Sequence, residues 1–426
     1  MKNKLAVLAS AALAITLAGC SGGNGPAGDS GSGANTSTEI NIWTLASANP
    51  AKDAAWDKLV KDFETANPDI TVKTDSYSTD QLKESLRLAT GTPSFPDAYM
   101  YWEGPGLGGE LVAAGASMDI TKYYDQYKWN DRFNDTVLAN VTRYGGHHGV
   151  PWTIQGEGLW YNKALFKQAG ITSEPKTYDE LVAAADKLKA AGVTPFATAG
   201  TVNWYIMRLL DPLIETKCGA AMMDKLATTA EAWDKQTCVT EAFTELKKWG
   251  DNYFNDGYMA LDTDSATDLF FRGEAAMVME GAWFGGDVKE KGPDMMNDVG
   301  LFSFPTGTGR LYGFGEGFYV GANSTKADAT VKFLDFITSA PSQKEFSGLW
   351  GAISVNKEVP PDSSNPLNAG WESIFNQATG MYLNNDQAMS LANVTEFWRI
   401  QNSVLTGDIA PDQAGAAFQQ FIEANK

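Results

Sequence analysis

Apolar and polar positions along the chain follow two periods, which predict strands and helices in alternation. Residues 39–43 alternate between polar and apolar side chains, as a half-buried strand does. The stretches 70–75 and 98–102 predict two further strands, and 82–89 predicts a helix between them. Another helix is predicted ahead of them by apolar residues on one face: Trp56, Leu59, Val60 and Phe63. This alternation favours an α/β fold with a parallel sheet.

Three later segments also predict helices, at 177–190, 331–338 and 411–425. Thr177 is expected to cap the first of them, and Gly192 follows its end. With 426 residues, the chain is long enough for two or more domains.

The N-terminal region has the pattern of a secretory signal. A positive start precedes an apolar run at residues 5–18, which is too short to span a bilayer. Residues 17–20 read Leu-Ala-Gly-Cys and resemble a bacterial lipobox, which implies a signal peptide at 1–19 and lipidation of Cys20. A plain signal peptide with an incidental cysteine is the alternative. Residues 20–38 are rich in Gly, Ser and Asn, so we expect a flexible tether behind the anchor.

Two further cysteines, Cys218 and Cys238, form an even pair in an exported chain. Such a pair predicts a disulfide, because oxidising compartments allow disulfides to persist. Two free buried thiols are the alternative.

The net charge of −19 limits the partners. Nucleic acid is excluded because phosphate binding needs a basic face, and an acidic surface also argues against lying on anionic lipid. We expect a monomer held at the outer face of the cell membrane through the lipid on Cys20.

Short motifs spread over residues 39–426 point to one family. They include Pro96-Asp97-Ala98, Gly149-Val150-Pro151-Trp152, Leu159-Trp160-Tyr161-Asn162-Lys163, Phe271-Arg272-Gly273-Glu274, Gly281-Ala282-Trp283 and Phe397-Trp398. Their order resembles that of family 1 extracellular solute-binding proteins, the maltose-binding type that serves carbohydrate ABC importers.

The resemblance implies a two-lobed, periplasmic-binding-protein-like α/β fold with hinge strands and a ligand cleft between the lobes. The N-terminal lobe would comprise residues 39–155 and 302–345. The C-terminal lobe would comprise residues 156–301 and 346–426.

The composition fits a carbohydrate ligand. A pyranose has an apolar C–H face and a rim of hydroxyls, so its site needs flat aromatic plates and polar side chains. The chain has 13 tryptophans. Five stand where the family places ligand contacts, with core packing as the alternative for each: Trp43, Trp102, Trp204, Trp283 and Trp398.

Six polar residues are candidates for binding sugar hydroxyls. Glu316 lies between glycines in the sequence Gly-Phe-Gly-Glu-Gly, where a carboxylate can approach a ligand closely. A solvated surface group is the alternative for each of the six: Asn49, Glu103, Gln155, Glu157, Glu316 and Arg399.

Signals for other chemistry are weak. His147 and His148 are adjacent in a Gly-rich turn and make a poor metal pair. Asp262, Asp264 and Asp268 lack the glycine and terminal glutamate of an EF-hand loop. We therefore expect no metal and no cofactor. The chain has no phosphate-binding loop, so a partner must supply the energy for transport.

These observations predict a solute-binding lipoprotein, not an enzyme. It would capture an oligosaccharide by lobe closure and deliver it to the permease subunits of an ABC transporter. A secreted glycoside hydrolase, or a binder of a non-sugar solute, is the alternative. The sequence nominates no carboxylate pair for hydrolysis, and the tryptophans favour an uncharged sugar.

Overall fold

The computed structural model describes residues 37–47, 49–142, 144–350, 353–361 and 365–425. The expected signal peptide, the lipidation of Cys20 and nearly all of the expected tether lie outside the described residues. Thr38, which was expected to be the last residue of the tether, begins the first strand.

Nine strands are present in the described part of the chain, and several lie where the alternation predicts them. The strands are β1 (Thr38–Leu45), β2 (Ile70–Tyr77), β3 (Ala98–Trp102), β4 (Gly149–Asn162), β5 (Thr194–Ala197), β6 (Ala275–Gly281), β7 (Val299–Phe302), β8 (Leu311–Val320) and β9 (Met381–Leu383).

The helices fall into groups along the chain. The first group is α1 (Pro50–Ala66), α2 (Thr79–Ala89), α3 (Gly108–Ala113), α4 (Thr121–Tyr127), α5 (Trp129–Arg132) and α6 (Asp135–Thr142). The second is α7 (Lys163–Gln168), α8 (Tyr178–Ala190), α9 (Asn203–Cys218), α10 (Ala220–Ala227), α11 (Thr237–Asn252), α12 (Thr263–Phe271) and α13 (Phe284–Lys291). The last is α14 (Ala327–Ile337), α15 (Ala340–Trp350), α16 (Pro366–Gln377), α17 (Asn385–Ala388), α18 (Leu391–Thr406) and α19 (Pro411–Ala424).

Local chemistry explains where several helices begin. The Asn49 side chain accepts hydrogen bonds from the first backbone N–H groups of α1, which starts at Pro50. Thr177 caps α8 as predicted, because its hydroxyl accepts a hydrogen bond from the N–H of Glu180. Gly192, just past α8, has a φ of +75°, a backbone conformation that favours glycine.

The sheet is mixed, which corrects the expected parallel sheet. Its strand order is β2-β1-β3-β8-β4-β6-β5, with β7 paired to β4 and β9 paired to β8. The pairs β1–β2, β1–β3 and β5–β6 are parallel, as predicted. The central strands β8 and β4 run antiparallel to each other and to β3 and β6. The expectation was wrong here because it considered only strand–helix–strand units, whereas long strands also cross from one lobe to the other.

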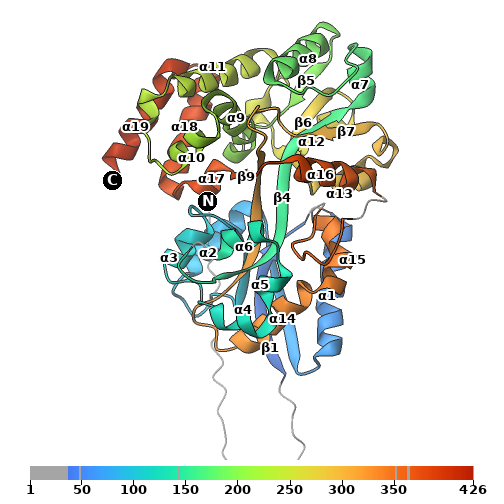
Figure 1. Cartoon of the computed structure of the whole chain (residues 1–426), viewed down its shortest axis with the longest axis vertical. Helices are drawn as coiled ribbons and strands as arrows, with labels where there is room; N and C mark the ends of the chain where they lie inside the picture. The colour runs from blue at the N-terminus through green and yellow to red at the C-terminus, as the bar shows by residue number, and fades with distance from the viewer. Residues whose placement is uncertain (1–36, 48, 143, 351–352, 362–364, 426) are drawn as a thin grey trace, which may run out of the picture. The chain divides into compact units, whose positions relative to one another are not determined.

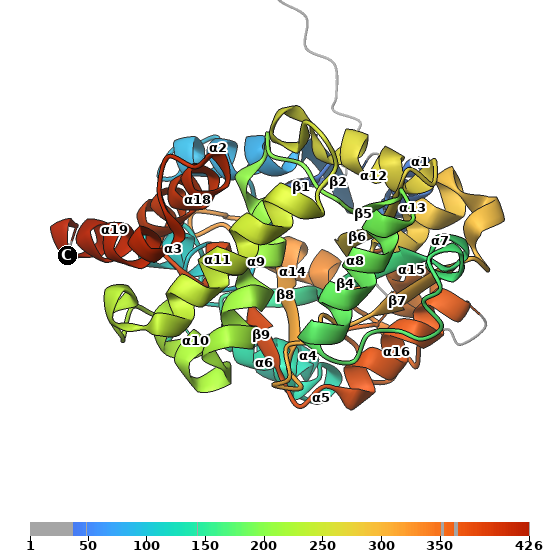
Figure 2. The same ribbon diagram turned by 90° about the horizontal axis from the view of Figure 1, so that it is seen from above.

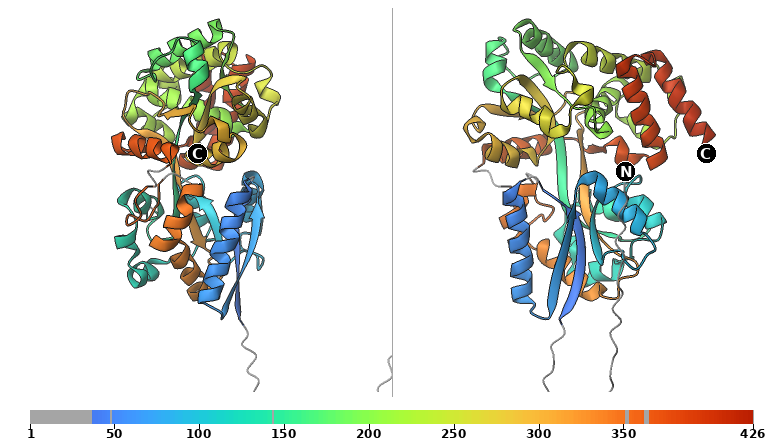
Figure 3. Two further views of the ribbon diagram at one scale, coloured as in Figure 1. Left: turned by 90° about the vertical axis from the view of Figure 1, so that its right-hand side faces the viewer. Right: turned by 180° about the vertical axis from the view of Figure 1, so that it is seen from behind.

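Two lobes share the long strands β4 and β8. The N-terminal lobe has one core, which includes Ile40, Ile154, Phe314 and Val355. The C-terminal lobe has two cores, whose members run from Leu159 to Ile422. Figures 1 and 3 show β4 passing from the group with α1, α14 and α15 to the group with α8, α11 and α12. The fold is therefore the two-lobed α/β type.

The cores locate three crossings between the lobes. The first lies on β4 between residues 154 and 159, close to the expected boundary at 155. The second lies on β8 between 312 and 314, and the third follows residue 355. The boundaries expected at 302 and 345 both precede these two crossings in the chain.

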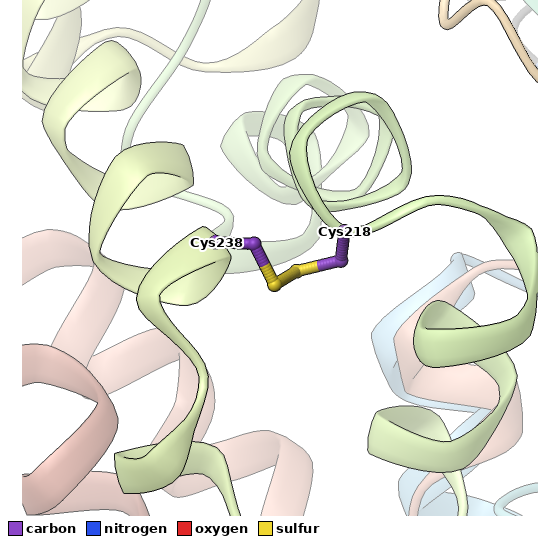
Figure 4. Close-up of a disulfide and its surroundings, with 2 residues drawn as sticks. All are labelled: Cys218 and Cys238. Atoms are coloured by element: carbon purple, nitrogen blue, oxygen red, sulfur yellow. A yellow bond between two sulfur atoms is a disulfide. The ribbon is translucent and has the colours of Figure 1, made fainter.

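The C-terminal lobe contains a disulfide between Cys218 and Cys238 (Figure 4). It joins the last residue of α9 to the first turn of α11, two helices that pack side by side (Figure 2). Both sulfurs lie beside the main core of this lobe. Among the described residues, the structure contains no helix that is long and apolar enough to cross a membrane.

Candidate functional site

A cavity of about 380 Å³ lies where the two lobes meet. This volume falls within the usual range for ligand sites, roughly 300–1,000 Å³. Its walls come from α1, α2, β3 and β8 on one side and from α9, α13 and α17 on the other, with β4 crossing between them. The cavity is therefore bounded by both lobes and by the crossing strands β4 and β8.

Alternation along β4 aims polar side chains into the cavity. Gln155 and Glu157 line it, whereas Gly156 and Gly158, which alternate with them, face the other way. A Cβ atom on Gly156 would lie 2.8 Å from the ring of Trp371, so only glycine fits there. The glycines let the core pack closely against a strand whose opposite face is polar.

A bulge on β4 adds an aromatic ring to the same wall. Pro151 pairs with Gly317 and Thr153 pairs with Glu316, so Trp152 is an extra residue in the ladder. A bulge re-aims the side chains beside it, and here Trp152 lines the cavity together with Gln155.

Seven of the eleven predicted ligand-binding residues line this cavity. They come from both lobes and include three of the five predicted tryptophans. The seven are Asn49, Trp102, Gln155, Glu157, Trp204, Trp283 and Glu316.

Two of the other predicted residues are buried in the N-terminal lobe. Trp43 belongs to the core of this lobe and packs on Tyr77, with ring centroids 5.0 Å apart. Glu103 is fully buried, and a Cβ atom on Gly315 would overlap its carboxylate. Since Gly315 alternates with Glu316 on β8, Glu103 lies on the face of the sheet away from the cavity.

Trp398 and Arg399 also lie outside the cavity. The indole of Trp398 donates to the Met207 sulfur at 3.1 Å and lines a second hollow of about 300 Å³. That hollow adjoins the cavity, because Trp204, Lys83 and Asp386 line both. Arg399 is exposed and pairs with Glu396 in its own helix, so its position on α18 directs it elsewhere.

Arg208, on α9, organises the wall of the C-terminal lobe. Its Nε lies 2.8 Å from a Glu157 carboxylate oxygen, and a terminal nitrogen donates to Glu280 at 2.9 Å. Its guanidinium also lies 4.8 Å from the ring centroid of Trp204 and 5.1 Å from that of Trp283. One buried cation thus holds two carboxylates and two indoles in place.

Two carboxyl groups that line the cavity have shifted acidities. Burial raises the pKa of Glu157 to about 7, although Arg208 and Asn384 oppose the shift. Burial likewise raises the pKa of Glu316 to about 7, against the influence of a hydrogen bond from Thr153 and the charge of Lys52. Both groups can therefore donate or accept hydrogen bonds near neutral pH.

The segment around α17 brings amide and carboxylate oxygens to the cavity. Asp211 anchors this segment, since it accepts hydrogen bonds from the backbone N–H and the side chain of Asn385. Four buried polar atoms of the cavity wall have no hydrogen-bond partner among the described residues: Trp204 Nε1, Asn384 Oδ1, Asp386 Oδ1 and Gln387 Oε1. Such atoms are costly unless something pairs with them.

Sequence reasoning missed several residues of the wall. Arg208 had a detectable signal, because it shares one face of a mostly apolar helix with Asp211 and Glu215. No such signal marks Lys52, Lys83, Asp287 or the α17 segment, since single polar residues on a helix look like ordinary surface.

The weak metal candidates have structural roles. The Asp262 side chain caps α12 by accepting from the N–H of Ser265. His147 and His148 bond to Thr121 and Ser117, respectively. No group of three or more His, Cys, Asp or Glu side chains in the described ranges is arranged to hold a metal ion.

A two-lobed α/β fold with an aromatic and polar cavity between its lobes defines a solute-binding protein. The sequence model of the bacterial extracellular solute-binding protein family matches residues 47–344, so the chain belongs to that family. Membership places the protein outside the cytoplasm.

Relatives and solved structures agree with this assignment. The chain is 29% identical over 380 residues to an ABC transporter extracellular-binding protein of Pyrococcus horikoshii, covering 86% of this chain and 83% of the relative. It is 26% identical to the multiple sugar-binding protein of Streptococcus mutans, over 74% and 75% of the two chains. A chitin oligosaccharide binding protein superposes with a TM-score of 0.83 at 25% identity, over 91% of this chain and 99% of the other.

Proposed function

We propose that the protein captures an oligosaccharide in the cavity between its lobes and delivers it to the permease subunits of an ABC transporter. The observation that carries the proposal is that four indoles line one cavity together with the unpaired oxygens of Asn384, Asp386 and Gln387. The four are Trp102, Trp152, Trp204 and Trp283. Indole faces suit the C–H face of a pyranose, and the polar atoms suit its hydroxyls. The names of the relatives support a sugar as the ligand.

The second hollow supports a ligand of several rings. It shares Trp204, Lys83 and Asp386 with the cavity and is also lined by Trp398, which the cavity is not. A monosaccharide would leave that extension unused, whereas an oligosaccharide would lie along both compartments. This arrangement gives Trp398 a role at the far end of the ligand.

Lobe closure is the proposed mechanism of capture. Three crossings connect the lobes, and β4 and β8 form two of them. Rotation about a few residues in such strands brings the walls together and excludes water. Micromolar affinity would require about −8 kcal/mol, which several stacked rings and hydrogen bonds can supply.

Hydrolysis is the weaker alternative. Glu157 and Glu316 both have a raised pKa, as a glycosidase acid requires. Glu157 is engaged by Arg208 at 2.8 Å and by Asn384 at 2.9 Å, so it is not free to act beside Glu316 as the second carboxylate that glycoside hydrolysis requires.

The anchor completes the proposal. A lipid on Cys20 and a tether up to residue 37 would keep the binding domain close to the permease. Mass spectrometry of the membrane fraction tests the anchor by comparing the wild type with Cys20→Ala. If the lipid holds the protein, the variant should be lost from that fraction. Retention of the variant in the membrane would contradict the anchor.

Calorimetric and thermal-shift titration with an oligosaccharide panel tests the proposed function. A ligand at 100 times its dissociation constant should stabilise the fold by about 2.7 kcal/mol. Chromatography of the same mixtures after long incubation should return the sugar intact. Shorter sugars in the mixture would favour hydrolysis, and no binding across the panel would contradict sugar capture.

A further inference from the structure

The charged side chains of the cavity form a nearly complete set of internal pairs. Three cations line the cavity, namely Lys52, Lys83 and Arg208. Each of them has a carboxylate partner within 4.0 Å. None is therefore left over to bind a charged ligand.

Two of the pairs join opposite lobes. Lys52 on α1 lies 4.0 Å from Asp287 on α13, and Lys83 on α2 lies 3.6 Å from Asp386 on α17. All four side chains line the cavity and are largely shielded from solvent. Lys83 is held further by the ring of Trp102, whose centroid is 4.9 Å from the ammonium. The cations of one lobe are thus neutralised by the other.

The third cation is compensated within its own lobe. Arg208 contacts both Glu157 and Glu280, so the cluster has one more carboxyl group than cations. Both carboxyl groups are buried, which strengthens their hold on the guanidinium. Arg208 consequently offers no free positive charge to the cavity.

One carboxyl group in the wall, that of Glu316, takes part in none of these ion pairs. Glu316 accepts a hydrogen bond from Thr153 and forms no ion pair within 4.0 Å among the described residues. It is 8% exposed and lies in the wall formed by the N-terminal lobe. The balance of the cavity is therefore neutral to negative.

We propose that this pairing makes the closed cavity selective for uncharged sugar rings and excludes sugars that carry a carboxylate. A uronate would enter a dry space without a free cation and close to Glu316. A buried charge without a partner is strongly disfavoured. The inference rests on the proposed function, because it specifies which sugars the same cavity accepts.

The test uses matched neutral and acidic sugars. Cellotriose, maltotriose and mannotriose are each paired with the uronate obtained by oxidising their C6 hydroxyls, and binding is measured by calorimetry at pH 7.5. The uronate of the trisaccharide that binds should bind at least 100-fold more weakly. A uronate that binds as tightly as its neutral parent would overturn the selectivity while leaving sugar capture intact. Failure of all six to bind would instead count against sugar capture and remove the inference with it.

Asp386→Asn adds a second, independent test. It frees Lys83 while Trp102 keeps the ammonium in the cavity. Uronate affinity should rise at least tenfold relative to that of the neutral parent. Asp412→Asn, an exposed substitution at the start of α19, is the matched control and should leave the ratio unchanged. An unchanged ratio in Asp386→Asn would overturn the inference.

Discussion

The two walls of the cavity hold their charges in different ways. In the C-terminal lobe, Arg208 is paired with Glu157 and Glu280 before anything else arrives. In the N-terminal lobe, Lys52 and Lys83 form their ion pairs with carboxylates across the cleft. The charges of the C-terminal wall are thus paired within one lobe, whereas the ion pairs of the N-terminal wall form only when the two lobes are close together. Changes to the first should thus affect stability most, and changes to the second should affect binding and its response to conditions.

The largest expected effect comes from Arg208→Met. Removing the guanidinium leaves Glu157 and Glu280 buried without their cation, which should cost about 3–5 kcal/mol of unfolding free energy. Urea denaturation measures the loss. Arg399→Met is the control, because its ion pair is exposed and should contribute less than about 1 kcal/mol. Equal losses in the two variants would contradict the organising role of Arg208.

The disulfide should stabilise only the lobe that contains it. Replacing Cys218 and Cys238 together by Ser opens a loop with a sequence separation of 20 and should cost about 3 kcal/mol. Hydrogen exchange resolves the location of the loss, which should appear in α9 and α11. Equal loss of protection in β1 and β2 would mean that the lobes unfold as one unit.

The pH dependence of stability should reveal the carboxyl group of Glu316, which forms no ion pair with the described residues of the N-terminal wall. The pKa of Glu316 is about 7 in the folded state and near 4.5 in the unfolded state. Between pH 4.5 and pH 7, this side chain therefore binds a proton when the protein folds. Stability from this group is complete below pH 4.5 and is lost as the pH rises through 7, by up to about 3 kcal/mol. Denaturation at pH 4.5 and 8 should show this loss in the wild type and a smaller one in Glu316→Gln. Parallel profiles would contradict the shift.

The smallest expected effect distinguishes an indole of the cavity, Trp204, from an indole of the core, Trp43. Trp204→Ala should weaken oligosaccharide binding at least tenfold, or about 1.4 kcal/mol, without unfolding the protein. Trp43→Ala is the comparison, since Trp43 is core and should reduce stability more than affinity. Calorimetry and denaturation together measure both quantities. A Trp204 variant with unchanged affinity would remove this indole from the site.

Local sequence patterns predicted local structure. The strands β1 to β3 and the cap at Thr177 were accessible because alternation and capping involve residues close together in the chain, whereas the two lobes were implied by the family resemblance. The antiparallel crossing of β4 and β8 was not, since it depends on which distant segments pair.

The candidate site was predicted only in part, for a physical reason. Trp102, Gln155 and Glu316 lie on strands or at their ends, where α/β sheets bind ligands. Arg208 and Asp386 lie on helices, and their roles depend on partners far away in the chain. Glu103 directly follows Trp102, and one step along an extended chain turns the side chain to the opposite face.

A crystal structure with a bound trisaccharide would test the central claim most directly. The account predicts sugar rings in the cavity between the lobes, with C–H faces on Trp204 and Trp283 and hydroxyls bonded to the oxygens of Asn384 and Gln387. A sugar bound on the outer surface of either lobe, with this cavity unchanged, would contradict it.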